Sequence, residues 1–195
     1  MGCAMECKAA EDCRVAVMLG EGFETIEALT SVDVLRRAGV EVVVASVMPT
    51  REVASAQGVP VTADAAVADG DVDLGGFDAI ILPGGMGGYE NLSACEPLRA
   101  ALASRLEEGR LVAAICAAPM LLAHLGLLDG RRATCYPSCE DVFPAGAYQP
   151  DDVVRDGNLI TGSGPAKSLP FALAVLEALA GKDVAVQVAS GMLAC

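Results

Sequence analysis

The sequence of 195 residues has no tryptophan, one histidine and half as many basic as acidic residues. Thirteen Lys and Arg against 26 Asp and Glu give a net charge of −13 at pH 7. Such a surface repels phosphates, which argues against nucleic-acid binding. Asp, Glu, Arg or Gly interrupts every apolar run before the roughly 18 residues that a membrane span needs, so no membrane association is expected.

Paired cysteine spacing is also missing. Eight cysteines without C-x-x-C pairs, together with one histidine, do not support a zinc site, and no metal is expected. The chain has the length of one domain, which we place at residues 13–195 after a flexible tail at 1–12. Charged residues within the first 13 positions do not fit a signal peptide. We therefore expect a soluble, cytoplasmic protein.

What is present is an alternation of apolar strands and amphipathic helices, which indicates an α/β fold with a largely parallel sheet. Ligand sites of such folds lie at the carboxyl ends of the strands. Strands are predicted at 14–19, 41–47, 79–82, 111–115 and 131–135, a short hairpin or edge piece at 59–63, a hairpin at 153–161, and helices at 25–38, 97–108, 120–125 and 169–179.

Cys116 stands where an apolar strand turns directly into a helix that Pro119 favours at its first position. Backbone N–H groups and the helix dipole at such a place stabilise a thiolate, so we expect a lowered pKa. The arrangement resembles a nucleophile elbow, although Ala114 and Ala118 stand at the glycine positions of the G-x-S-x-G pattern. An inert, buried cysteine is an equally good interpretation of this segment alone.

Two other segments become candidates by the same reasoning. The glycine-rich stretch 83–88 follows a predicted strand and would let N–H groups approach a reacting oxygen, although ordinary turns also contain glycines. Glu27 lies on the core-facing row of the first helix, where burial raises the pKa of a carboxyl. A protonated Glu27 would then donate a hydrogen bond to a nearby sulfur. The alternative is an acid that merely favours the helix start.

Several segments together resemble the ThiJ/PfpI superfamily, and most closely its DJ-one/YajL-like branch, from about residue 13 to about 188. They are ETIEAL at 24–29 with VDVLRRAG at 32–39, ILPGG at 81–85, AAICAAP at 113–119 and TGSGP at 161–165. The resemblance implies a flavodoxin-like sandwich with a mostly parallel central sheet, a nucleophile elbow and a homodimer.

The resemblance also implies roles for single residues. Cys116 is then the reactive nucleophile, Glu27 the carboxyl bonded to it, and Gly84, Gly85 and Ala117 donors for an oxyanion or substrate. Tyr136 occupies the position of a histidine found in many glyoxalase-type members. Since a neutral phenol is a poor general base, Cys-His chemistry is doubtful. The only histidine, His124, is eight residues beyond Cys116 on the same predicted helix, too far along to reach the sulfur.

Two functions of different classes follow from this resemblance. The first is a cofactor-independent enzyme of the glyoxalase III or deglycase type, whose Cys116 attacks methylglyoxal-type carbonyls or their early adducts on amino groups while Glu27 relays protons. The second is a non-enzymatic redox sensor or chaperone-like stress protein that works through oxidation of Cys116. Turnover of methylglyoxal by the purified protein distinguishes them.

Overall fold

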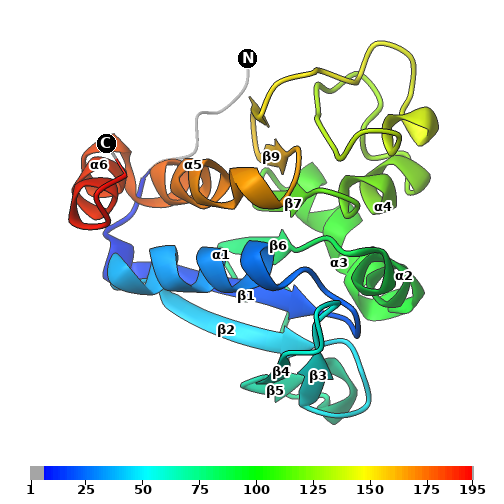
Figure 1. The fold of residues 1–195 in the computed structure, drawn as a ribbon, viewed down its shortest axis with the longest axis horizontal. Coiled ribbons are helices and arrows are strands. Elements are labelled where there is room, and N and C mark those ends of the chain that lie inside the picture. The colour runs from blue at the N-terminus through cyan, green and yellow to red at the C-terminus, as the bar shows by residue number, and fades with distance from the viewer. Residues whose placement is uncertain (1–6, 195) are drawn as a thin grey trace.

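A seven-stranded sheet forms the centre of the computed structural model, which describes residues 7–194 (Figure 1). Its strand order is β5-β2-β1-β6-β7-β9-β8, and all neighbours are parallel except β8 and β9. The strands are β1 (Arg14–Leu19), β2 (Glu41–Ser46), β5 (Ala65–Ala66), β6 (Ala79–Leu82), β7 (Leu111–Ile115), β8 (Val153–Asp156) and β9 (Leu159–Gly162). The predicted α/β class with a mostly parallel sheet is confirmed.

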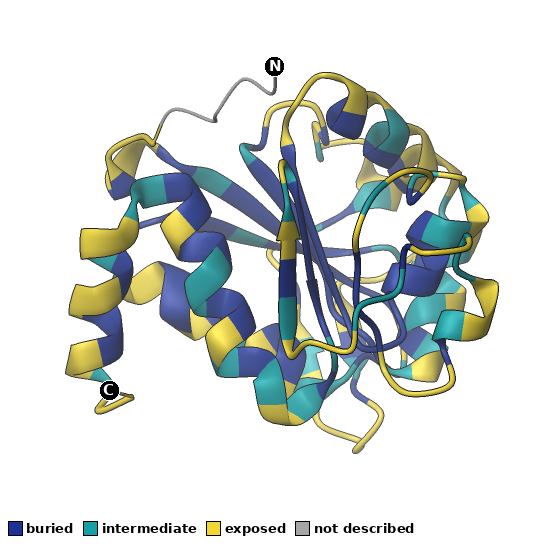
Figure 2. Cartoon of the chain, turned by 90° about the horizontal axis from the view of Figure 1, so that it is seen from above, coloured by how far each residue is buried: buried dark blue, intermediate teal, exposed yellow. Residues whose placement is uncertain are grey.

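Helices cover both faces of this sheet (Figure 2). One face carries α1 (Thr25–Arg37) and α5 (Ser168–Ala180), with α6 (Lys182–Gly191) packed beside α5. The other face carries α2 (Met86–Ala94), α3 (Glu96–Glu107) and α4 (Pro119–His124). The central strands are dark blue in Figure 2 because they are buried between these two layers.

Strand β1 shows why the apolar runs form this sandwich. Its side chains alternate between the two faces of the sheet, so Val15 and Val17 enter the core under α1 and α5. Ala16 and Met18 enter the core on the opposite face. A strand with both faces buried must be apolar throughout, and this explains the continuous run in the sequence.

A separate two-stranded hairpin lies outside the main sheet. Strand β3 (Glu52–Ala54) pairs antiparallel with β4 (Pro60–Thr62), which confirms the short hairpin predicted around 59–63. In Figure 1 this hairpin lies near the start of α1. A bridge between Phe23 and Ser55 joins the two.

The strand predicted at 131–135 is not formed. This segment makes one isolated bridge, between Ala133 and Tyr148, and the Thr134 N–H donates to the side chain of Thr161. The nearby strand β9 already has β7 on one side and β8 on the other. Because both edges of β9 are occupied, the segment cannot pair with β9.

Two helices were not predicted. Helix α2 begins at Met86, so only residues 83–85 of the expected glycine-rich loop remain a loop. Gly87 and Gly88 lie inside α2, and close packing explains why both are glycine, since a Cβ on either would come within 2.9 Å of a backbone atom of Glu21 or Phe23. Helix α6 follows α5 after Gly181, where we predicted no further helix.

Half of the expected N-terminal tail lies outside the described residues, namely 1–6. Residues 7–12 lie against the domain: the Lys8 N–H donates to the Leu179 carbonyl, and the Lys8 ammonium pairs with Asp78. Ala10 begins a short 3-10 turn and is buried. Across residues 7–194, every helix is too short or too polar to cross a bilayer.

Candidate active site

Cys116 occupies a sharp turn between β7 and α4. Its φ of 64° is in the left-handed region, which is rare for a residue other than glycine and costs of order 1–3 kcal/mol. Two neighbouring segments hold this conformation. The Cys116 N–H donates to the Gly162 carbonyl at 2.9 Å, and the Cys116 carbonyl accepts from the Tyr136 N–H at 2.9 Å. The turn therefore has the strained geometry of a nucleophile elbow.

Glu27 approaches this elbow from the first turn of α1. Its side chain is fully buried, because the helix row that carries it faces the sheet. Oε2 accepts a hydrogen bond of 2.7 Å from the Gly84 N–H. Oε1 is buried without a partner of good hydrogen-bond geometry, while the carboxyl and the Cys116 thiol are close enough to interact by a hydrogen bond.

The loop after β6 brings the backbone into contact with both side chains. A Cβ at Gly84 would lie 2.7 Å from the Cys116 Cβ and 2.8 Å from Oε2 of Glu27. The N–H groups of Gly85 and Ala117 lie close enough to the Cys116 sulfur to favour a thiolate there. We expected Gly84 to be a donor of the same kind, but its N–H is already bound to Glu27.

Burial dominates the proton affinity of Glu27. It raises the pKa of the carboxyl to about 7, and the nearby charge of Glu24 acts in the same direction. The hydrogen bonds from Gly84 and Cys116 partly oppose this rise because they stabilise the carboxylate. Glu27 therefore changes its charge close to neutral pH.

The expected lowered pKa of Cys116 is wrong. Burial, followed by the charge of Glu27, raises the pKa of the thiol to about 12. The Gly85 and Ala117 N–H groups favour the thiolate, but they compensate for only part of this cost. The sequence argument considered the helix start and not the desolvation of a sulfur whose residue is only 8% exposed.

The two groups form a coupled pair. Between about pH 7 and 12 they share one proton, which resides on sulfur next to a Glu27 carboxylate. Transfer of this proton from sulfur to Glu27 leaves the net charge of the pair unchanged. Glu27 is therefore placed to act as a base for the thiol, and the two N–H groups are placed to stabilise the thiolate that results.

Two further residues considered in the sequence lie around the pair. Tyr136 touches the elbow through its backbone N–H, while the residue is 49% exposed and its ring lies close to Gly164. His124 lies at the end of α4, and its Nδ1 is 3.1 Å from the Tyr89 hydroxyl. It therefore belongs to a contact between α2 and α4 and not to the elbow.

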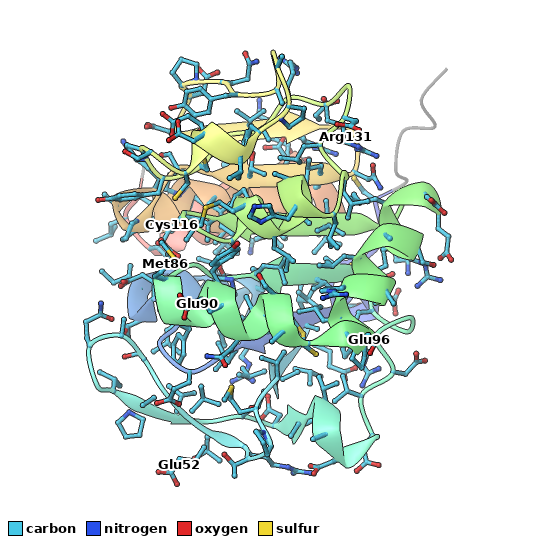
Figure 3. All side chains as sticks on the ribbon, turned by 90° about the vertical axis from the view of Figure 1, so that its right-hand side faces the viewer. Glu52, Met86, Glu90, Glu96, Cys116 and Arg131 are labelled. Atoms are coloured by element: carbon cyan, nitrogen blue, oxygen red, sulfur yellow. The ribbon has the colours of Figure 1, made fainter. Side chains whose placement is uncertain are left out.

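In Figure 3, Cys116 and Met86 lie near each other, and Glu90 follows on α2. Met86 begins α2 directly after Gly85 and is 55% exposed. Within residues 7–194 there is no group of three or more His, Cys, Asp or Glu side chains placed to hold a metal ion. The chemistry available here is that of a thiol, a carboxyl and backbone N–H donors.

Comparison with known proteins gives relatives over most of the chain. The chain is 40% identical over 179 residues to "Protein dj-1beta" of Drosophila melanogaster, covering 91% of this chain and 95% of that protein. It is 34% identical over 177 residues to "Glutathione-independent glyoxalase DJR-1.2" of Caenorhabditis elegans, covering 90% and 92%. "Protein DJ-1 homolog B" of Arabidopsis thaliana is 39% identical over 177 residues, but the match spans only 40% of its length.

Solved structures agree with these relatives. The structure described as "Toxoplasma gondii DJ-1, oxidized" superposes with a TM-score of 0.87 at 38% identity, covering 93% of this chain and 98% of that one. The expected flavodoxin-like sandwich is confirmed by this likeness. The model of the DJ-1/PfpI family matches residues 13–178. The chain therefore belongs to the DJ-1/PfpI family.

Proposed function

We propose that this protein converts methylglyoxal-type 2-oxoaldehydes into 2-hydroxy acids without a cofactor, through Cys116 and Glu27. The observation that carries the proposal is the buried Glu27 carboxyl, held by the Gly84 N–H, next to a thiol whose ionised form two nearby backbone N–H groups favour. The printed name of the Caenorhabditis elegans relative, a glutathione-independent glyoxalase, supports the same reaction class.

The residues suit each proton movement that this reaction needs. Glu27 takes the thiol proton while the sulfur adds to the aldehyde carbon, and the new oxyanion lies near the N–H groups of Gly85 and Ala117. Glu27 gives the thiol proton to this oxyanion and is a carboxylate again. It then moves the proton of the former aldehyde carbon to the neighbouring carbonyl carbon, while the hydroxyl proton passes to the neighbouring oxygen, which leaves a thioester. Water cleaves the C–S bond and releases lactate with the thiol restored. The sum is methylglyoxal plus water giving lactic acid.

An early adduct of methylglyoxal on an amine can enter the same sequence. Its C–N bond breaks as the amine leaves with a proton, and the released aldehyde carbon passes to sulfur. Adduct plus water then gives free amine and lactic acid. We propose that Tyr136, half-exposed beside the elbow, contacts the substrate in both reactions.

The test is formation of lactate from methylglyoxal by the purified protein, Cys116→Ser, Glu27→Gln and, as a matched control, Cys95→Ser. We expect Cys116→Ser to abolish turnover and Glu27→Gln to lower kcat/KM by about 10²–10⁴-fold. Cys95 is a half-buried thiol between α2 and α3, and its replacement leaves the rate unchanged. Equal rates for all four proteins would contradict the proposal.

A second candidate function is redox sensing through Cys116. It is favoured by the Gly85 and Ala117 N–H groups, which stabilise an oxidised sulfur as well as a thiolate. Peroxide would convert the thiol to a sulfenic acid and water, and a second peroxide would give the sulfinic acid. A stable sulfinate on Cys116 by peptide mass spectrometry, with no lactate formed, would favour sensing over catalysis.

We also propose a homodimer in the cytoplasm. Ile26 and Leu29, three residues apart on α1, are 54% and 37% exposed, and Val59 on the hairpin is 42% exposed. Large apolar side chains grouped on one helix favour a protein interface. Sedimentation equilibrium of the wild type and of Ile26→Asp measures this directly, and a wild-type monomer would contradict it.

A further inference from the structure

The hairpin β3–β4 is bound to the segment that leads into α1. The Gly22 N–H donates to the Ala54 carbonyl at 2.8 Å, and the Ala56 N–H donates to the Phe23 carbonyl at 2.9 Å. On the other side of this segment, the Glu24 N–H donates to the Gly84 carbonyl at 2.9 Å. The segment is therefore held between the hairpin and the loop that supplies the donor to Glu27.

Gln57, in the turn of the hairpin, completes this connection with its side chain. Its Oε1 accepts from the Thr25 hydroxyl at 2.7 Å and from the Thr25 N–H at 3.5 Å. Its Nε2 donates to Oε2 of Glu24 at 2.9 Å. Glu24 is the N-cap residue of α1 but makes no capping bond with its own side chain, so Gln57 is the side-chain acceptor at this helix start.

The direction of the Glu24 carboxylate matters because Glu27 is three residues further along the same helix. Residues at this spacing lie about 5–6 Å apart at Cβ. Among residues 7–194, the charge that acts on Glu27 is that of the Glu24 carboxylate at the helix start, while the neutral Cys116 thiol acts on it through a hydrogen bond. Glu24 is half-buried, so its charge is screened less than that of a free surface acid.

We infer that Glu24, held in place by Gln57, is a positioning residue that raises the pH at which Glu27 becomes a base for Cys116. Glu24 repels the second negative charge on Glu27, so Glu27 keeps its proton to a higher pH than burial alone would require. Gln57 strengthens this effect by binding the Glu24 carboxylate beside the helix start. The inference rests on the Glu27–Cys116 pair of the proposed function, but not on turnover.

The test measures the rate at which iodoacetamide alkylates Cys116, followed on the Cys116 peptide by mass spectrometry as a function of pH. This rate needs no substrate, so it is informative even if no lactate is formed. In the wild type we expect it to rise with the ionisation of Glu27. In Glu24→Gln we expect the midpoint to fall by about 0.5 pH unit, the size of one charge at this spacing in a mostly aqueous dielectric.

Control variants separate charge from fold. Glu52→Gln removes the same charge from an exposed position of the same hairpin, and its midpoint should equal that of the wild type. Glu24→Asp keeps the charge, so its midpoint should lie close to that of the wild type. Gln57→Ala should move the midpoint in the same direction as Glu24→Gln, but by less.

The double variant Glu24→Gln/Gln57→Ala gives the sharpest result. If Gln57 acts only through Glu24, the double variant has the midpoint of Glu24→Gln alone, which is a non-additive cycle. Midpoints that are equal in the wild type, Glu24→Gln and Gln57→Ala would overturn the inference. So would an equal shift in Glu52→Gln. If Glu24→Gln fails to fold, the midpoint of Gln57→Ala is compared with that of Glu52→Gln, and equal midpoints would overturn the inference.

Discussion

At the scale of single residues, the chemistry of this protein depends on where one proton lies. Glu27 is fully buried and Cys116 nearly so, and burial disfavours the charge on both. One negative charge is tolerated because the Gly84 N–H binds the carboxylate and two other N–H groups face the sulfur. The carboxylate is the more stable site for that charge, so the thiol is activated only when Glu27 takes its proton.

The pH dependence of the proposed reaction follows from this order. Below about pH 7 Glu27 is protonated and cannot accept the thiol proton. We expect kcat/KM for methylglyoxal to rise with pH in proportion to the ionised fraction of Glu27, with a midpoint near 7. Glu27→Gln should lose both the rate and this midpoint. A wild-type profile that is flat across that midpoint would show that Glu27 is not the base.

Gly84 has no room for any side chain. In Gly84→Ala the new Cβ would meet the Cys116 Cβ, Oε2 of Glu27 and the Ile115 carbonyl, all within 2.8 Å. We expect a loss of about 1–3 kcal/mol in the free energy of unfolding. We also expect a loss of turnover, since the Glu27 and Cys116 side chains must move apart. Gly191→Ala is the matched control, because a Cβ there meets nothing within 4 Å. Urea unfolding and lactate formation measure both effects, and similar behaviour of the two variants would contradict this account.

At the scale of elements, the site is made by three strand ends that carry different parts. The turn after β7 carries the sulfur and the Ala117 N–H, the loop after β6 brings the N–H groups of Gly84 and Gly85, and α1 after β1 carries the carboxyl. These strands are neighbours in the order β1-β6-β7, so their carboxyl ends meet at one edge of the sheet. The loop after α4 contributes two more buried thiols, Cys135 and Cys139.

These thiols provide an internal comparison for reactivity. Burial raises the pKa of Cys135 to about 12, as it does for Cys116, but the groups near Cys135 are Cys139 and Glu140, which only add to the rise. We expect Cys116 to react with iodoacetamide faster than Cys135, because Cys116 alone has Glu27 as a base and two N–H donors.

Glu27→Gln should slow the labelling of Cys116 and leave that of Cys135 unchanged. Peptide mass spectrometry after timed quenching gives both rates in one sample. Cys135 labelled first, or both thiols slowed by the variant, would contradict the role assigned to the elbow.

At the scale of the whole molecule, the site has a cost in stability. The folded chain binds the Glu27 proton up to about pH 7, whereas an ordinary glutamate releases it near 4.5. Between these values the folded state holds more protons than the unfolded state, so the free energy of unfolding falls as pH rises. The fold tolerates the buried charge because one extensive apolar core on each face of the sheet stabilises the folded state.

This linkage predicts a measurable difference in unfolding. Relative to Glu27→Gln, the wild type should lose about 3 kcal/mol of stability as the pH rises from 4.5 to above 7. Glu41→Gln, at an exposed position on β2, should keep the wild-type pH dependence. Urea unfolding at a series of pH values tests this, and parallel curves for the wild type and Glu27→Gln would show that burial does not hold the proton.

The sequence by itself determined the alternation of strands and helices, because buried strands must be apolar and helices must present one apolar face. It also made Cys116 and Glu27 candidates, each beside an inert alternative, and their roles came from the family resemblance of the surrounding segments. Helix α2 escaped prediction because Gly87 and Gly88 are poor helix formers that are present for close contact with another chain segment. The strand expected at 131–135 failed because β9 has no free edge. Only the tertiary structure decided the proton positions, since the pKa of a thiol depends on desolvation and on charges that approach it from distant parts of the chain.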